Sequence, residues 1–182
     1  NNQSENFINT HGVGDKINFK NKYIIVSQHP VTTEYLKTTK DFRETLKALE
    51  DINVQKIFLW PNTDAGSDKI SKQIRIWREK KRIKNIRFLK NIPSDLYLTL
   101  MKNCACIVGN SSSAIREGSF IGTPAVNIGT RQNNRLRGKN VIDVKNEANK
   151  ISESVLKQLN KGNYRSENMY GDGNSSKKII KI

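Results

Sequence analysis

Short apolar runs alternate with longer amphipathic segments along this chain, and that alternation limits its fold more than any other feature. Runs with the length of buried strands occur at residues 23–26, 56–60, 86–89, 104–108, 125–128 and 141–144. Segments with apolar residues at helical spacing lie between them, as with Ile70, Ile74 and Trp77. Because apolar runs without alternation are typical of strands covered on both faces, the sequence predicts an α/β domain with a doubly wound parallel sheet of about six strands.

The length of 182 residues suits one domain. Residues 1–21 are polar and show no clear period, so we expect a tail or an inter-domain linker ahead of a Rossmann-like domain at residues 22–182. Residues 175–182 are expected to form one more helical stretch. Cys104 and Cys106 lie on a predicted buried strand, where we expect them to pack in the core of a cytoplasmic protein. Few other thiols or histidines lie near them, and we expect no metal and no cofactor.

The positive charge of the chain raises the question of anionic partners. Lys and Arg number 32 against 17 Asp and Glu, and the net charge of +15 suggests polyanions, anionic membranes or phosphorylated substrates. A dense basic run at 78–82 ends a predicted helix, where cations complement the helix dipole. No aromatic residues interleave with it, as they do in single-strand binders. We expect no nucleic-acid partner and no membrane partner, since no apolar run reaches the ~18 residues of a span.

Polar segments follow three of the predicted strands, at 28–30, 61–64 and 109–113. Ligands of such sheets bind beyond the carboxyl ends of the strands. The third segment, Gly-Asn-Ser-Ser-Ser, is the most informative, because small residues let the backbone approach a ligand and a predicted helix at 112–120 follows at once. Free N–H groups at a helix start bind phosphate, and serine hydroxyls add donors. The sequence therefore predicts a phosphate site here, although it holds no Walker motif.

Two features near this segment allow more than one interpretation. Glu117 lies about a turn and a half into the predicted helix, where a carboxylate can bind a ribose diol. It fits equally well a surface glutamate that the helix dipole favours. Arg131, Arg135 and Arg137 follow the fifth strand, and arginine suits bidentate phosphate contacts. Loop arginines are, however, more often simply solvated.

The three polar segments are parts of longer sequence motifs, and further motifs follow them along the chain. These motifs are QHPVT (28–32), WPNTDAGSD (60–68), GNSSSAIRE (109–117), GTP (122–124), NIGTRQ (127–132), RGKNV (137–141) and YGDG (170–173). Together they resemble the C-terminal half of UDP-N-acetylglucosamine 2-epimerases, and most closely the hydrolysing branch that makes N-acetylmannosamine for sialic-acid-type sugars. The resemblance covers residues 22–182 and implies the two-domain GT-B architecture, with the UDP-sugar between two Rossmann-like halves. The N-terminal catalytic half has no counterpart in this sequence.

The resemblance also implies residue roles. His29 is implied as the catalytic group, at the diphosphate or assisting its departure. The implied substrate-binding residues are Asn62, Tyr97, Asn110, Ser111, Ser112, Ser113, Glu117 and Arg131. Among them, Ser111 and Ser112 would hold the UDP phosphates, Glu117 the ribose and Arg131 the diphosphate or sugar, while the segment 91–97 would meet uracil.

The implied chemistry is loss of the C2 proton of UDP-N-acetylglucosamine, anti elimination of UDP, and addition of water to release N-acetylmannosamine. It needs no cofactor, and the full protein is expected to be a homo-oligomer that also contains the N-terminal half. The alternatives are half of a GT-B UDP-sugar glycosyltransferase, a basic nucleic-acid-binding module, and a nucleotide-sugar sensor without turnover. The identity of the UDP-2-acetamido sugar stays open, as does the choice between a hydrolysing and a non-hydrolysing outcome.

Overall fold

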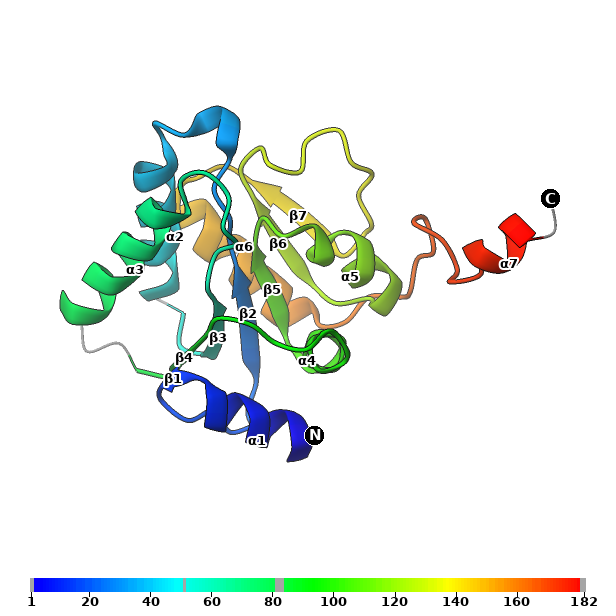
Figure 1. Cartoon of the computed structure of the whole chain (residues 1–182), viewed down its shortest axis with the longest axis horizontal. Coiled ribbons are helices and arrows are strands. Elements are labelled where there is room, and N and C mark those ends of the chain that lie inside the picture. Colours follow the sequence, from blue (N-terminus) through cyan, green and yellow to red (C-terminus); the bar gives the residue numbers. More distant parts are fainter. Residues whose placement is uncertain (1, 51, 81–83, 181–182) are drawn as a thin grey trace.

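The computed structural model describes residues 2–50, 52–80 and 84–180 (Figure 1). Residues 81 and 82 of the basic run and residues 181 and 182 of the predicted C-terminal helix therefore lie outside the described residues. The described part of the chain contains one seven-stranded sheet with the order β1-β4-β3-β2-β5-β6-β7. Its strands are β1 (Val13–Gly14), β2 (Tyr23–Ser27), β3 (Gln55–Leu59), β4 (Ile86–Leu89), β5 (Cys106–Gly109), β6 (Ala125–Ile128) and β7 (Val141–Val144).

The strand order confirms the predicted doubly wound α/β fold. The six strands from β2 to β7 are parallel, and only β1, at the edge, runs antiparallel to its neighbour β4. Numbered along the chain, the parallel strands follow the order 3-2-1-4-5-6 of dinucleotide-binding folds. The direction of strand addition reverses between β2 and β5, and the crevice at their carboxyl ends is where such folds bind ligands.

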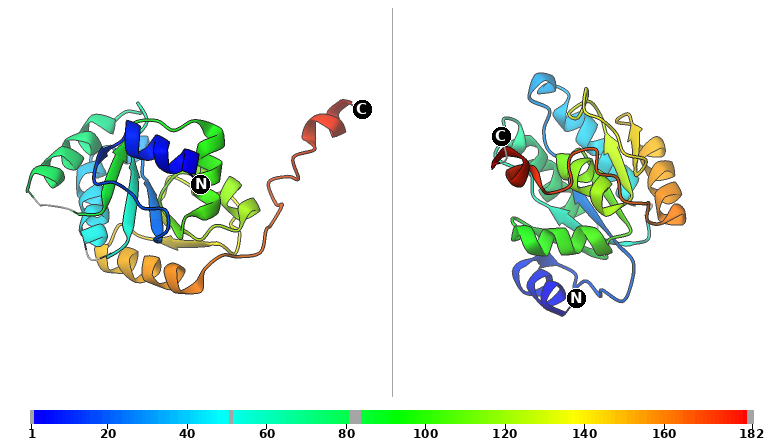
Figure 2. Two further views of the ribbon diagram at one scale, coloured as in Figure 1. Left: turned by 90° about the horizontal axis from the view of Figure 1, so that it is seen from below. Right: turned by 90° about the vertical axis from the view of Figure 1, so that its right-hand side faces the viewer.

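Helices cover both faces of the sheet (Figure 2). The helical elements are α1 (Asn2–His11), η1 (Thr32–Glu34), α2 (Thr38–Glu50), α3 (Ser67–Lys80), α4 (Ser94–Asn103), η2 (Ser112–Ala114), α5 (Arg116–Ile121), α6 (Ala148–Lys161) and α7 (Ser175–Ile180). One buried cluster joins α2, α3 and α6 to the sheet through Ile24 and Val26 of β2. Another joins α1 and α4 to the opposite face through Tyr23 and Ile25. Successive residues of β2 thus enter different cores, which explains its unbroken apolar run.

The N-terminal residues differ from the tail or linker expected at 1–21. Residues 2–11 form α1, whose Ile8 is fully buried, and Val13 of β1 pairs with Phe88 of β4. The buried guanidinium of Arg87 fixes this segment by donating to the carbonyls of Ile8 (3.0 Å), Asn9 (2.5 Å) and Gly14 (2.6 Å). The helical period of apolar residues is weak here because α1 is short and mostly polar. The residue that anchors α1, Arg87, lies far along the chain.

Smaller differences concern element ends. The fourth parallel strand begins at Cys106 and not at Cys104, because the N–H of Cys104 still closes α4 by donating to the Leu100 carbonyl. Both thiols are buried, as expected, and burial raises their pKa values. The helix predicted at 112–120 is divided into η2 and α5. The C-terminal segment extends away from the body of the protein and ends in the exposed helix α7 (Figures 1 and 2).

Within the described residues, no helix is both long enough and apolar enough to cross a membrane. No group of three or more His, Cys, Asp or Glu side chains gathers there closely enough to hold a metal ion.

Candidate functional site

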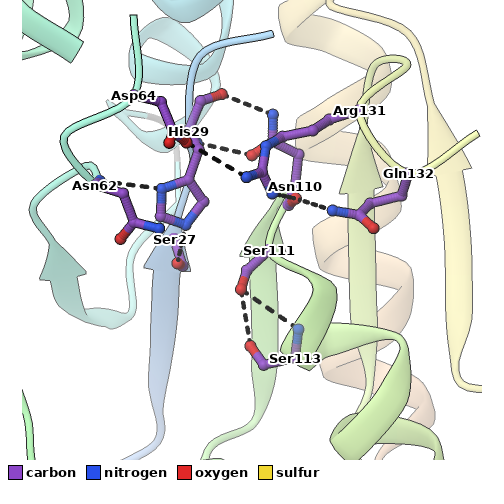
Figure 3. A network of polar contacts seen from close by, with 9 residues as sticks. All are labelled: Ser27, His29, Asn62, Asp64, Asn110, Ser111, Ser113, Arg131 and Gln132. Atoms are coloured by element: carbon purple, nitrogen blue, oxygen red, sulfur yellow. Dashed lines mark hydrogen bonds and ion pairs between the residues drawn. The ribbon is translucent and has the colours of Figure 1, made fainter. Parts of the chain in front are cut away.

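The loops after β2 and β5 meet at the switch point and are joined by the side chain of Asn110 (Figure 3). Its Oδ1 accepts from the backbone N–H of His29 (2.7 Å), and its Nδ2 donates to the backbone carbonyl of His29 (2.8 Å). The backbone N–H of Asn110 donates to the carbonyl of Ser27 (3.1 Å). Asn110 is 2% exposed, and both ends of its amide are occupied. Its side chain therefore positions the two loops, and the substrate contact expected of Asn110 stays a prediction.

Gly109 allows the close approach of these loops. Its φ is +136°, and a Cβ atom built there would lie 2.0 Å from the Ser27 carbonyl oxygen. Only glycine fits this combination of backbone conformation and contact. From the sequence, we expect small residues in this segment to let the backbone approach a ligand. At Gly109 the missing side chain instead makes room for strand β2.

The ring of His29 is buried and engaged at both nitrogens. The backbone N–H of Asn62 donates to Nδ1 (3.2 Å), and Nε2 lies 3.3 Å from Ser27 Oγ. Burial is the main cause that lowers the pKa of His29 to about 4, the charge of Arg131 lowers it further, and Asp64 opposes this shift. His29 is therefore neutral at neutral pH. Because Nδ1 accepts a hydrogen bond, the single ring proton resides on Nε2.

Three hydroxyl groups form a connected row beside this histidine. Ser111 Oγ lies 2.9 Å from Ser113 Oγ, which lies 2.8 Å from the Tyr97 hydroxyl. Ser111 also caps η2 by accepting from the backbone N–H of Ser113 (3.4 Å). Burial raises the pKa of Tyr97 to about 12, so its phenol stays protonated at neutral pH. The row therefore offers hydroxyl donors from α4 and from the loop after β5.

One pocket of about 240 Å³ brings most of the predicted site residues together. It is lined by His29, Asn62, Tyr97, Ser111 and Ser113, and also by Asn91 of the segment expected to meet uracil. Ser27 and Lys90 line it as well and were not singled out from the sequence. The position of Ser27, the last residue of a parallel strand at the switch point, was the available signal.

Arg131 lies beside a second, more open pocket of about 550 Å³, together with Asp64 and Thr130. Its Nη2 forms an ion pair with Asp64 Oδ2 (3.5 Å), and its Nη1 donates to the Asn110 carbonyl (3.4 Å). Gln132 donates from Nε2 to the same carbonyl (2.8 Å). The Arg131 side chain is 28% exposed, so it holds the loop after β5 and still meets solvent at the pocket.

Glu117 faces a different pocket, of about 510 Å³, between α4, α5 and the C-terminal segment. Leu98, Phe120 and Tyr170 give this pocket an apolar lining. Besides burial, the charge of Glu117 contributes to the raised pKa of Tyr97, which lines the pocket of about 240 Å³.

Ser112 and Arg137 do not line the pocket that holds His29. Ser112 begins the η2 turn and is half-buried. Arg137 is engaged within its own loop: it pairs with Asp143 (3.0 Å) and donates to the carbonyls of Arg135 (2.7 Å) and Gln132 (2.9 Å). Of the three loop arginines, Arg131 is thus the one placed at the switch point.

Comparison with known proteins identifies relatives of this chain. The family model described as UDP-N-acetylglucosamine 2-epimerase matches residues 2–182. The UDP-N-acetylglucosamine 2-epimerase of Neisseria meningitidis serogroup B is 32% identical over 155 residues, which are 84% of this chain and 40% of that protein. The UDP-N,N'-diacetylbacillosamine 2-epimerase (hydrolyzing) of Legionella pneumophila is 31% identical over 161 residues, which are 88% of this chain and 42% of that protein.

Solved structures support the fold. The UDP-GlcNAc 2-epimerase of Methanocaldococcus jannaschii superposes with a TM-score of 0.72 and 20% identity, covering 100% of this chain and 49% of that one. The Neisseria meningitidis UDP-GlcNAc 2-epimerase bound to UDP-GlcNAc gives a TM-score of 0.66 at 18% identity, covering 91% of this chain and 45% of that one. The chain thus spans less than half the length of these relatives.

Proposed function

Because this chain belongs to the UDP-N-acetylglucosamine 2-epimerase family, we propose that it is the nucleotide-binding half of an enzyme that acts on UDP-N-acetylglucosamine or a related UDP-2-acetamido sugar. The remaining length of the relatives corresponds to a second Rossmann-like half, which completes the active site. The chain by itself binds UDP and does not turn the substrate over.

One observation carries this proposal: the pocket at the β2–β5 switch point combines hydroxyl donors with a neutral histidine. Ser111, Ser113 and Tyr97 line it on one side and His29 on the other. Oriented neutral donors stabilise the charge of a diphosphate without needing to reorganise when it leaves. Arg131, beside the pocket, adds positive charge. In this proposal uracil lies toward Tyr97 and Asn91, the ribose toward Glu117, and the sugar toward Asn62 and Arg131.

The protonation state of His29 supports the proposal that this half binds the nucleotide and that the second half supplies the catalytic base. A general base must accept the proton that it removes, but Nε2 of His29 already carries a proton and Nδ1 is occupied by the N–H of Asn62. His29 is therefore not the base for the sugar C2 proton. We assign that base to the second half of the protein, which also excludes water when it closes over the pocket.

For the reaction itself we propose the hydrolysing route. The C2 proton is removed, UDP leaves by anti elimination, and water adds to the resulting 2-acetamidoglucal to give N-acetylmannosamine and UDP. Two of the relatives are described as hydrolyzing and support this route, whereas a third is described simply as a 2-epimerase. Homo-oligomer formation, a place in sialic-acid synthesis and a cytoplasmic location stay predictions.

The test is turnover by the isolated chain and by the chain joined to the rest of its protein. UDP-N-acetylglucosamine in H₂¹⁸O is the substrate, and release of UDP and of free sugar is measured by mass spectrometry. We expect no product above background from the isolated chain, and free N-acetylmannosamine carrying ¹⁸O at C1 from the joined protein. Epimerised UDP-sugar without free sugar would refute the hydrolysing route, and robust turnover by the isolated chain would refute the division of labour.

A further inference from the structure

Ser27 is a site residue to which no role has yet been assigned. We propose that the Ser27 hydroxyl, oriented by His29, donates the hydrogen bond to the diphosphate, and that His29 acts on the ligand through Ser27. This inference rests on the proposed UDP-sugar binding and names a contact within that site. It makes Ser27 a ligand-contacting residue and His29 a positioning residue.

The ring of His29 contacts Asn62 at one nitrogen and Ser27 at the other (Figure 3). A backbone N–H can only donate, so the contact from Asn62 makes Nδ1 of His29 an acceptor. A protonated ring would place a second N–H against that of Asn62, which disfavours the imidazolium. The neutral ring then has its only proton on Nε2, and this proton points at Ser27 Oγ, 3.3 Å away.

The direction of the His29–Ser27 hydrogen bond determines where the hydroxyl proton of Ser27 can point. Because Nε2–H is the donor of this pair, Ser27 Oγ is the acceptor, and its own hydroxyl proton must be directed elsewhere. Within the described residues, Ser27 Oγ has no other hydrogen-bond partner. Its proton is therefore available to an acceptor that enters the site.

The Ser27 hydroxyl lies at the switch point of the sheet. Ser27 is the last residue of β2 and lies opposite Gly109, the last residue of β5, in the parallel register. It lines the pocket of about 240 Å³ together with Ser111 and Ser113, although it is only 3% exposed. Hydroxyl groups from both strands of the switch point thus line one cavity. Phosphate oxygens only accept hydrogen bonds, so a diphosphate there matches these donors.

This arrangement also accounts for the burial of His29. A histidine that contacts a ligand directly needs a free ring nitrogen, whereas both nitrogens of His29 are engaged by protein groups. Its neutral ring fixes the rotation of the Ser27 hydroxyl before the ligand arrives. Such preorganisation lowers the cost of orienting a donor upon binding.

The experiment measures binding of UDP and of uridine by calorimetry to the 182-residue chain and to its Ser27→Ala and Ser27→Thr variants. Ser152→Ala, on the distant helix α6, is the matched control. We expect Ser27→Ala to weaken UDP about 10- to 100-fold, the usual effect of one hydrogen bond to a charged group, and to leave uridine binding unchanged. Ser27→Thr retains the hydroxyl and should restore most of the UDP affinity.

A double-mutant cycle with His29→Gln separates positioning from direct contact. We expect His29→Gln to weaken UDP binding in the wild-type chain and to cause no further loss in Ser27→Ala. Additive losses would mean that His29 reaches the diphosphate itself and would overturn the inference. UDP binding by Ser27→Ala at wild-type strength would also overturn it while leaving the proposed function intact. Failure of the wild-type chain to bind UDP would overturn both.

Discussion

His29 is a buried neutral histidine at the point where two loops meet, and its surroundings favour the uncharged ring. Burial and the charge of Arg131 lower its pKa to about 4, against an ordinary value of 6.5. Its backbone is fixed by Asn110 and its ring by the N–H of Asn62. Such a group makes the stability of the fold depend on pH, because between the two pKa values the histidine is protonated in the unfolded chain and neutral in the folded chain.

We predict that the wild-type chain loses stability as the pH falls from 6.5 to about 4. In this window the unfolded state binds more protons than the folded state, so the free energy of unfolding rises with pH. The lowered pKa corresponds to a loss of stability on the order of 3 kcal/mol across this pH range. Urea unfolding of wild type and His29→Gln between pH 7 and 4 checks this. The stability difference between the two proteins should shrink toward pH 4, and parallel curves would contradict the prediction.

Single residues of the site were predictable from the sequence to differing degrees. Ser111, Ser113 and Tyr97 were found because strand ends and a family resemblance point to them, and the structure brings them together. The role of Ser27 and the inward orientation of Asn110 were missed. Both depend on partners in other loops, such as the N–H of Asn62, which lies 33 residues from His29. No local pattern encodes such a contact.

Helix α1 and strand β1 illustrate how a polar segment is held against a sheet edge. Their main polar anchor is the guanidinium of Arg87 in β4, which donates to three carbonyls at 2.5–3.0 Å. Ile8 supplies the fully buried apolar contact. A buried cation hydrogen-bonded in this way leaves several unpaired groups when it is removed.

We predict that Arg87→Met detaches α1 and β1 without unfolding the central sheet. The variant keeps the apolar stem but leaves the carbonyls of Ile8, Asn9 and Gly14 unpaired, each at a cost of about 1–3 kcal/mol. Hydrogen exchange should rise in residues 2–14 and stay low in β2 and β5. Arg75→Met, at an exposed position on α3, is the control and should leave hydrogen exchange unchanged in residues 2–14 and in β2 and β5. Unchanged protection of α1 in Arg87→Met would show that Arg87 does not anchor it.

The elements themselves were largely predictable because their signals are local. The runs at 86–89, 125–128 and 141–144 coincide with β4, β6 and β7, since each strand is marked by its own mostly apolar residues. Strands β4 and β6 are buried throughout, whereas β7 lies at the sheet edge and is mostly half-buried. Helices α2, α3 and α6 bury the predicted faces, including Phe42, Ile70 and Ile151. Segment α1–β1 was missed because its anchor, Arg87, is remote in sequence.

The molecule as a whole combines a dinucleotide-type strand order with a net charge of +15. The charge alone allows non-specific attraction to any polyanion, which would fall steeply with salt. The strand order instead places a ligand at one crevice, where the Ser111–Ser113–Tyr97 row and the Ser27–His29 pair line a common pocket. We therefore propose that this pocket, and not the diffuse charge, binds UDP.

The most direct test is calorimetric titration of UDP into the wild-type chain and into Ser111→Leu, at low and at physiological salt. Ser175→Leu, at the exposed start of α7, is the control. Loss of the η2 cap should cost Ser111→Leu about 1 kcal/mol of stability, so the variant remains folded. We predict that wild type and Ser175→Leu bind UDP at both salt concentrations and that Ser111→Leu binds none. Binding by Ser111→Leu within about twofold of wild type would show that UDP does not bind at this pocket, since one lost charge-assisted hydrogen bond changes affinity by tenfold or more.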